Sequence, residues 1–126
     1  MPLNVLVVDD SAVMRAMIVK TLQMAGLHLG TVTHAANGQE GLEALDGAWV
    51  DLVILDINMP VMDGEAMLEA MRGQAELANL PVIVVSTEGS DTRISRLVGR
   101  GVTFVHKPFA PESIRDVVGE LLGVVP

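Results

Sequence analysis

The sequence contains no cysteine and no tyrosine, and its 126 residues include only one tryptophan and two phenylalanines. Without cysteine, the chain cannot form a disulfide framework or a thiolate metal site. No apolar run reaches the roughly 18 residues that a membrane-spanning helix needs. The segment Met1–Asn4 also lacks the basic residues that begin a secretory signal. These absences predict a cytoplasmic protein that does not enter a membrane.

Positive charge is also scarce, because 8 lysines and arginines stand against 16 aspartates and glutamates, for a net charge of −8. Such a surface repels phosphate backbones, so we expect no direct binding to nucleic acid. Half of the residues are hydrophobic and 19% are charged, which is typical of a globular fold. We expect residues 1–126 to form a single monomeric domain, whose output depends on binding a protein partner.

Short apolar runs alternate with longer segments of helical period. The predicted strands are residues 5–8, 31–35, 52–55, 82–85 and 102–105. Continuous apolar runs are typical of strands buried on both faces of a parallel sheet, whereas residues 31–35 alternate and suit a strand nearer an edge. The predicted helices cover about 12–25, 38–45, the segment after 63–64, 91–98 and 111–122. This alternation predicts a doubly wound α/β fold with right-handed crossovers and a five-stranded parallel sheet.

Polar residues follow four of the predicted strands. Asp9 and Asp10 follow the first, Asp56 the third, Ser86 the fourth and Lys107 the fifth. Ligands bind at the carboxyl ends of the strands in open α/β sheets. If the first and third strands are neighbours, three carboxylates converge and repel one another unless a cation lies among them. Oxygen ligands of this kind suit Mg²⁺.

These residue types together fit phosphoryl transfer. A carboxylate can attack phosphorus and form an acyl phosphate. A metal ion and a lysine would neutralise the charge on the transferring group, and a serine hydroxyl could donate a hydrogen bond to a phosphate oxygen.

Four motifs carry a resemblance to a known family, and each lies at the end of a predicted strand. They are Val7-Val8-Asp9-Asp10-Ser11, the segment from Leu55-Asp56 to Asp63-Gly64, Val85-Ser86-Thr87-Glu88, and Lys107-Pro108-Phe109. In this order they resemble bacterial response-regulator receiver domains, most of all the stand-alone chemotaxis type. The resemblance covers essentially the whole chain. It implies a flavodoxin-like (βα)5 three-layer sandwich with strand order 2-1-3-4-5.

The resemblance also implies roles for individual residues. Asp56 would accept the phosphoryl group, and Mg²⁺ would be held by Asp56, Asp10 and the backbone carbonyl of Asn58, with Asp9 acting largely through water. The remaining roles are phosphate binding for Ser86 and Lys107, the switch aromatic for Phe104, and control of the phosphoryl lifetime for Asn58 and Glu88.

The implied partners are a histidine kinase that donates the phosphoryl group and an output protein, with the flagellar motor switch as one candidate. The output face would be formed by the fourth helix, the fifth strand and the fifth helix.

The chain departs from the family pattern in three places, namely Thr87 in place of a small residue, the segment Gly99-Arg100-Gly101, and the absence of a hydroxyl on Phe104. The two glycines lower helix propensity, so the end of the fourth helix is expected to fray or shift.

Each of these residues also has a simpler structural explanation. Asp9 and Asp10 could cap the first helix, Ser86 could cap the fourth, and Phe104 could be ordinary core. Asp56 or Lys107 could belong to turns.

Three other functions compete with a receiver. A metal-dependent phosphatase with an aspartyl-phosphate intermediate would need a general acid near Asp56. A flavin-binding module would need a phosphate loop where Asp9 and Asp10 stand. A pseudo-receiver would not need this complete set of acids, Ser86 and Lys107.

Overall fold

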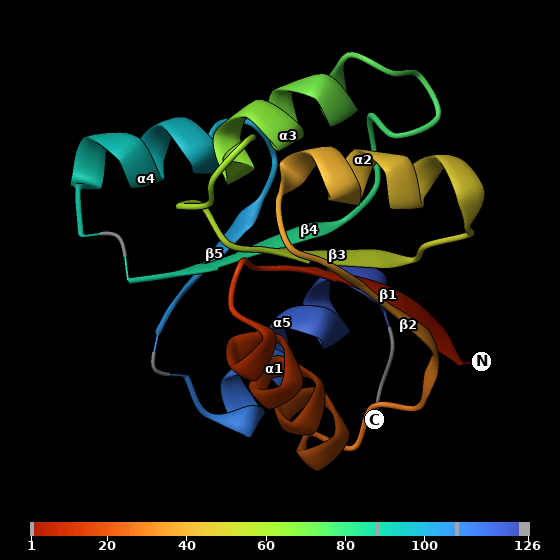
Figure 1. Ribbon diagram of the computed structural model, residues 1–126. Coiled ribbons are helices and arrows are strands. Elements are labelled where there is room, and N and C mark those ends of the chain that lie inside the picture. Colours follow the sequence, from red (N-terminus) through yellow and green to blue (C-terminus); the bar gives the residue numbers. More distant parts are fainter. Residues whose placement is uncertain (1, 88, 108, 124–126) are drawn as a thin grey trace.

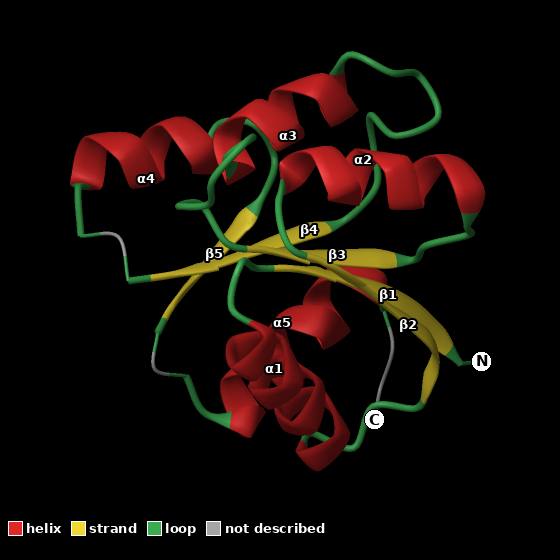
Figure 2. Cartoon of the chain, viewed as in Figure 1, coloured by secondary structure: helices red, strands yellow, loops and turns green. Residues whose placement is uncertain are grey.

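The computed structural model describes residues 2–87, 89–107 and 109–123, so Glu88 and Pro108 of the predicted motifs lie outside the described residues. Strands and helices alternate along the chain (Figures 1 and 2). The strands are β1 Leu3–Val8, β2 Leu29–Ala35, β3 Leu52–Leu55, β4 Val82–Ser86 and β5 Thr103–His106. The helices are α1 Ala12–Met24, α2 Gly38–Gly47, α3 Gly64–Arg72, α4 Asp91–Val98 and α5 Pro111–Leu122. The predicted elements are all present, with ends that differ by one or two residues where they differ at all.

The strands form one parallel sheet in the order β2-β1-β3-β4-β5, which confirms the predicted topology. Strand β2 is at the edge, as its alternating pattern predicted. Helices α1 and α5 cover one face of the sheet, and α2, α3 and α4 cover the other (Figure 1). The result is a three-layer sandwich in which the chain reverses its winding direction between β1 and β3.

Each face of the sheet has its own core, because successive strand residues point to opposite sides. In β1, Val5 and Val7 pack with Ile18 and Leu22 of α1. Leu6 and Val8 of the same strand pack with the α3 side on the other face, where Met67 is fully buried. Burial on both faces explains why the central strands are continuous apolar runs rather than alternating ones.

Two glycines flank Arg100 in the turn after α4, and the fraying or shift of the helix end that they suggest stays a prediction. Helix α4 ends at Val98, and the backbone N–H of Gly99 still donates to the carbonyl of Ser95 at 2.9 Å. Gly101 has a φ of 84°, a left-handed conformation that glycine adopts without steric cost. The conformational freedom of glycine is therefore used at Gly101 rather than at Gly99, whose φ is −61°.

None of the helices in the described part of the chain is long and apolar enough to cross a bilayer.

Candidate metal and phosphate site

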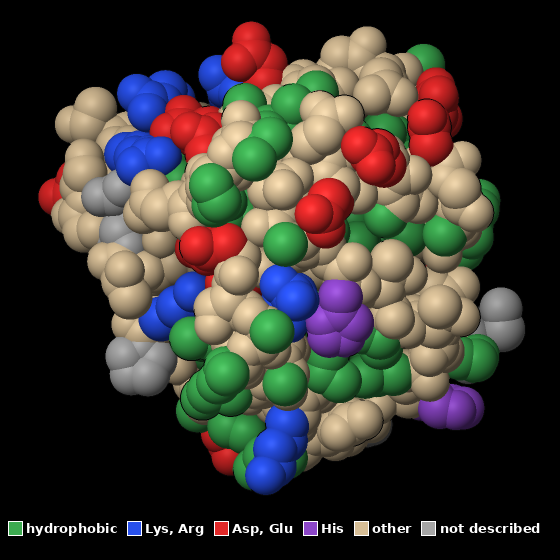
Figure 3. All heavy atoms as spheres, viewed as in Figure 1, with side chains coloured by type: hydrophobic (Ala, Val, Ile, Leu, Met, Phe, Trp, Pro, Cys, Tyr) green, Lys and Arg blue, Asp and Glu red, His purple; other side chains and the backbone are tan. Residues whose placement is uncertain are grey.

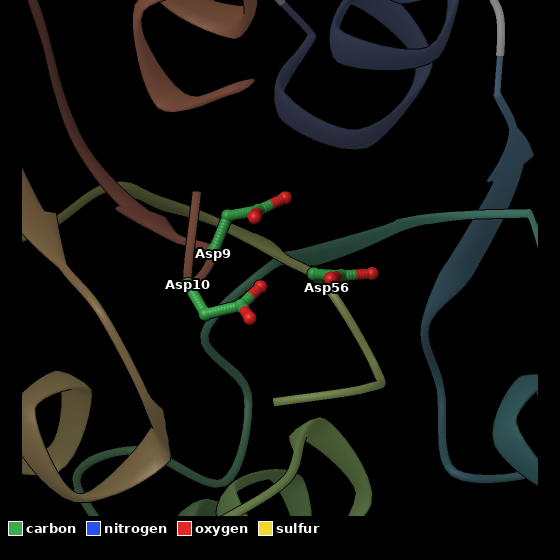
Figure 4. Close-up of side chains that lie close together, drawn as sticks. All are labelled: Asp9, Asp10 and Asp56. Carbon is green, nitrogen blue, oxygen red and sulfur yellow. The ribbon is translucent and has the colours of Figure 1, made fainter. Parts of the chain in front are cut away.

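The acidic residues converge because β1 and β3 are adjacent and parallel. Val8 pairs with Leu55, so the residues that follow them, Asp9 and Asp56, leave the same edge of the sheet side by side. The backbone N–H of Asp56 donates to the carbonyl of Val8 at 2.9 Å and ties the two strand ends together. Asp9, Asp10 and Asp56 each offer a carboxylate oxygen within 4.8 Å of the others (Figure 4). This group can hold a metal ion with hard oxygen ligands.

Lys107 lies beside two of these carboxylates. Its Nζ atom is 3.2 Å from Oδ2 of Asp9 and 3.7 Å from Oδ1 of Asp56. The lysine follows β5, and its backbone N–H donates to the carbonyl of Ser86 at 2.9 Å. The side chain of Lys107 is only 14% exposed, so solvent screens these charges weakly. The lysine therefore offsets part of the repulsion among the acids in the absence of a metal.

Burial differs sharply between the neighbouring acids. Asp9 is 2% exposed, whereas Asp10 is exposed to solvent. Oδ1 of Asp9 accepts a hydrogen bond from the backbone N–H of Ser11 at 2.9 Å, and its backbone carbonyl accepts one from Arg15. The N-cap of α1 is Ser11, whose hydroxyl oxygen accepts from Met14 N–H. Capping of α1 by Asp9 or Asp10 is therefore wrong as an explanation of these acids.

The environment of Asp56 disfavours its negative charge. Burial raises the pKa of the Asp56 carboxyl, and the nearby Asp9 and Asp10 add to that rise. The Lys107 ammonium and the hydrogen bond from Ile57 N–H act in the opposite direction but do not cancel it. A partly buried carboxylate with a raised pKa, one lysine and two further acids is the arrangement expected of a functional site.

The loop from Asp56 to α3 is tightly constrained. A Cβ atom on Gly64 would lie 2.3 Å from the backbone oxygen of Asp56, so only glycine permits this close approach. Val61 has a φ of 67°, and the N–H of Met62 donates to the carbonyl of Pro60 across it at 2.7 Å, which forms a γ-turn. A positive φ is rare for a β-branched residue, and nothing in the local sequence pattern indicated it.

Ser86 and Phe104 occupy different surroundings. Ser86 is 1% exposed at the end of β4, and the N-cap of α4 is Ser90, so capping by Ser86 is wrong.

Phe104 is partly buried against the core on the α2–α4 face. Its ring centroid lies 4.7 Å from that of His106 in an edge-on arrangement. Asn58 is exposed in the loop after β3, and Thr87 is exposed after β4.

Sequence reasoning missed the arginines around Asn58. Arg93 Nη1 of α4 donates to Oδ1 of Asn58 at 3.3 Å, and Arg93 Nε donates to Glu65 of α3 at 2.7 Å. A charged residue on a helix gives no indication from the sequence alone of which neighbouring helix it will contact.

The fold and the site together define a doubly wound α/β domain with an acidic site where the winding direction changes, the usual location for ligands in such folds. Residues 5–119 match the response regulator receiver domain family. The chain belongs to that family, which confirms the interpretation drawn from the motifs. It is 33% identical to chemotaxis protein CheY1 of Helicobacter pylori over 123 residues, covering 96% of this chain and 98% of that protein.

Two solved structures show the same likeness. Chemotaxis protein CheY4 of Vibrio cholerae superposes with a TM-score of 0.83 at 36% identity, covering 97% of this chain and 100% of that one. CheY in a complex with CheX, beryllium fluoride and magnesium from Borrelia burgdorferi has a TM-score of 0.83 at 28% identity, covering 96% of this chain and 90% of that one. Neither the family match nor these relatives support the phosphatase alternative.

Proposed function

We propose that this chain is a phosphorylation-dependent switch of a two-component system and that Asp56 accepts the phosphoryl group. The observation that carries the proposal is the position of Asp56 at the end of β3, with Lys107 Nζ 3.7 Å from its Oδ1 and two further acids close by. A structural carboxylate would be more stable with fewer acidic neighbours, because like charges at this distance repel. This repulsion would be offset when the acids bind a cation and Asp56 accepts a phosphoryl group.

The proposed transfer is a single displacement at phosphorus. A carboxylate oxygen of Asp56 attacks the phosphorus atom of a phosphohistidine on the kinase, and a new P–O bond forms. The P–N bond breaks, and the imidazole leaves with the electron pair of that bond. Lys107 neutralises charge on the phosphoryl oxygens, and the hydroxyl of Ser86 donates a hydrogen bond to one of them.

The donor set fits Mg²⁺, because hard carboxylate oxygens of three acids lie within 4.8 Å of one another at one edge of the sheet. Asp10, Asp56 and the backbone carbonyl of Asn58 would hold the ion, and Asp9 would contribute largely through water. When bound, the ion neutralises negative charge on the carboxylates and on the phosphoryl oxygens. The exposure of Asp10 and the burial of Asp9 support this division of roles.

Lifetime and output depend on residues around this centre. Asn58 and Glu88 are proposed to control how long the phosphoryl group survives, and Phe104 to move when Ser86 and Lys107 are drawn toward the phosphate. The hydrogen bond from Lys107 N–H to Ser86 carbonyl supports a joint movement of the two strand ends. Movement there would alter the face formed by α4, β5 and α5, because Phe104 is part of β5.

The likeness to CheY1 and CheY4 supports a role in chemotaxis, with a histidine kinase as donor and an output protein such as the flagellar motor switch as the receiver of the signal. We propose that the chain works in the cytoplasm as a monomer. Its own reactions would be phosphoryl acceptance and slow loss of the phosphoryl group, without turnover of a separate substrate.

The test is incubation with acetyl phosphate and Mg²⁺, followed by intact-mass measurement. Wild-type protein should gain the mass of one phosphoryl group as acetate leaves. Asp56→Asn should gain none, and Asp46→Asn, an exposed acid on α2, should gain the same mass as wild type. No mass gain in the wild type, under conditions that label an established receiver domain, would contradict the proposal.

A further inference from the structure

Arginines gather where α4 meets α3. Four of the 8 basic residues in this acidic chain are found there: Arg72 ends α3, Arg93 and Arg96 are on α4, and Arg100 is in the following turn. Figure 3 shows basic side chains around acidic ones at the upper left, where Figure 1 has α3 and α4. The clustering is notable because the acidic site already uses Lys107, and only three other basic residues remain in the sequence.

Glu65 of α3 is the centre of this cluster. Its Oε1 accepts from Arg93 Nε at 2.7 Å and from Arg96 Nη2 at 2.9 Å, and its Oε2 accepts from Arg96 Nε at 3.0 Å. The hydrogen bond from Arg96, followed by that from Arg93, lowers the pKa of the Glu65 carboxyl. The side chain of Glu65 is 18% exposed, so this carboxylate is a fixed anchor between the two helices.

Arg93 differs from Arg96 because it also contacts the loop after Asp56. With its Nε on Glu65, the planar guanidinium places Nη1 at 3.3 Å from Oδ1 of Asn58. The geometry of a guanidinium is rigid, so the bond to Glu65 sets the direction in which the second donor points. The side chain of Asn58, two residues beyond the acceptor carboxylate, is thus held by α4 through one arginine.

We propose that Arg93 is a positioning residue, which holds the side chain of Asn58 at the rim of the acidic site and thereby slows hydrolysis of the phosphoryl group on Asp56. This inference rests on the proposed phosphorylation of Asp56. It assigns to α4 a direct influence on the phosphoryl lifetime, through the contact Glu65–Arg93–Asn58.

The hydrolysis that would be slowed is a displacement by water. The water oxygen attacks phosphorus, the bond between phosphorus and the Asp56 oxygen breaks, and the carboxylate leaves with the electron pair. Inorganic phosphate and a proton pass to solvent. The attack runs in line with the breaking bond, so water approaches from the side away from the carboxylate. Asn58 is exposed two residues beyond Asp56, and a side chain held in place at this position would obstruct water more than a rotating one.

The experiment follows the lifetime of the phosphoryl group. Wild type, Arg93→Ala, Asn58→Ala and the double variant are phosphorylated with acetyl phosphate and Mg²⁺, the donor is removed, and loss of the phosphoryl mass is timed. Arg93→Ala should lose the group about threefold faster or more, a change within the range of coupling between contacting residues. Asn58→Ala should also lose it faster, and the double variant should be no faster than Asn58→Ala alone. The rate of phosphoryl gain should change less than the rate of loss.

The matched control is Arg96→Ala, which removes an arginine from the same carboxylate of Glu65 and should keep the wild-type lifetime. Arg93→Lys keeps the charge but not the forked donors, so it should behave as Arg93→Ala. Glu65→Gln weakens the anchor without altering Arg93 and should shorten the lifetime in the same direction. A melting temperature for each variant shows that it is folded.

Additive effects of Arg93→Ala and Asn58→Ala would overturn the inference, as would equal lifetimes in wild type and Arg93→Ala. A loss rate in Arg96→Ala that equals the rate in Arg93→Ala would also overturn it, since the effect would then come from the helix contact alone. Failure of the proposed function is distinguishable, because in that case no protein, wild type included, gains the phosphoryl mass at all.

Discussion

Asp56 lies where its own charge is unfavourable, and this has a measurable consequence at the scale of one residue. Its carboxyl is partly buried beside Asp9 and Asp10, and its pKa is raised. A raised pKa in the folded state means that the folded protein holds the proton more tightly than the unfolded chain does. The ionised carboxylate therefore lowers the free energy of unfolding at neutral pH, and that cost disappears as the pH falls below the ordinary carboxyl range.

We accordingly expect Asp56→Asn to be more stable than wild type at pH 7 in a chelating buffer. The difference should shrink toward zero at about pH 3, below the ordinary pKa of an unfolded aspartate. Lys107 keeps its contact with Asp9 in the variant, so no unpaired lysine offsets the gain. Urea unfolding at pH 7 and at about pH 3 measures the free energy of unfolding of both proteins. A variant that is less stable than wild type at pH 7 would show that Lys107 outweighs burial.

Val61 presents a second effect confined to one residue. Its φ of 67° strains a β-branched backbone, and its side chain is 85% exposed and contributes little packing. Val61→Gly should raise the free energy of unfolding by about 1 kcal/mol, because the relief of strain exceeds the entropy that glycine adds to the unfolded chain. Val13→Gly, the same change at an exposed position in α1, should lower it. Urea unfolding of both variants provides the comparison.

At the scale of an element, α4 is joined to its neighbours at both ends. Arg93 and Arg96 join it to Glu65 of α3, and Arg72 Nε donates to the carbonyl of Arg100 in the following turn at 3.3 Å. The direction in which the chain leaves α4 depends on Gly101, whose φ is 84°. This turn sets where β5 begins, and β5 is followed by Lys107.

Gly101→Ala should therefore lower the free energy of unfolding by about 1 kcal/mol, the cost of a left-handed alanine. An added Cβ would meet no atom within 4 Å at Gly101, so the loss is one of backbone conformation and not of space. Gly47→Ala is the matched control, since Gly47 ends α2 with equally open surroundings and no positive φ. That change should be neutral or stabilising by up to about 1 kcal/mol. Equal effects of the two substitutions, measured by thermal unfolding, would contradict the argument.

At the scale of the whole molecule, the negative charge matters most at one edge of the sheet, where three acids lie close together and repel one another. The net charge is −8, and half of the acids are exposed on helices, whereas Asp9 and Asp56 are held together by the pairing of β1 with β3. A cation that binds only the folded chain stabilises the whole fold by mass action.

Mg²⁺ should raise the melting temperature, with a stabilisation of about 2.7 kcal/mol at 100 times the dissociation constant. Asp10→Ala should abolish this response. The same variant should be at least as stable as wild type without metal, because it removes a repulsive charge as well as a ligand. Asp46→Ala, which removes an exposed acid outside the cluster, should keep the response. Differential scanning calorimetry with and without Mg²⁺ tests these outcomes, and an equal shift in wild type and Asp10→Ala would place the metal elsewhere.

The sequence by itself determined the elements and the position of the site along the chain. Apolar runs and helical periods are local properties, so they located each strand and helix, and the parallel sheet then required the strand-end residues Asp9, Asp56 and Lys107 to meet at one edge. The family motifs added the roles that remain predictions. None of this required knowledge of which helix packs beside which.

Only the tertiary structure decided the unequal burial of Asp9 and Asp10, the strained turn at Val61, and the contact of Arg93 with Glu65 and Asn58. The contact of Arg93 depends on how α3 and α4 are placed against each other. Long charged side chains reach several neighbours from one backbone position, and the packing of two helices selects among them. The sequence pattern sets which residues of a helix face the core, but it does not set the angle at which two neighbouring helices pack.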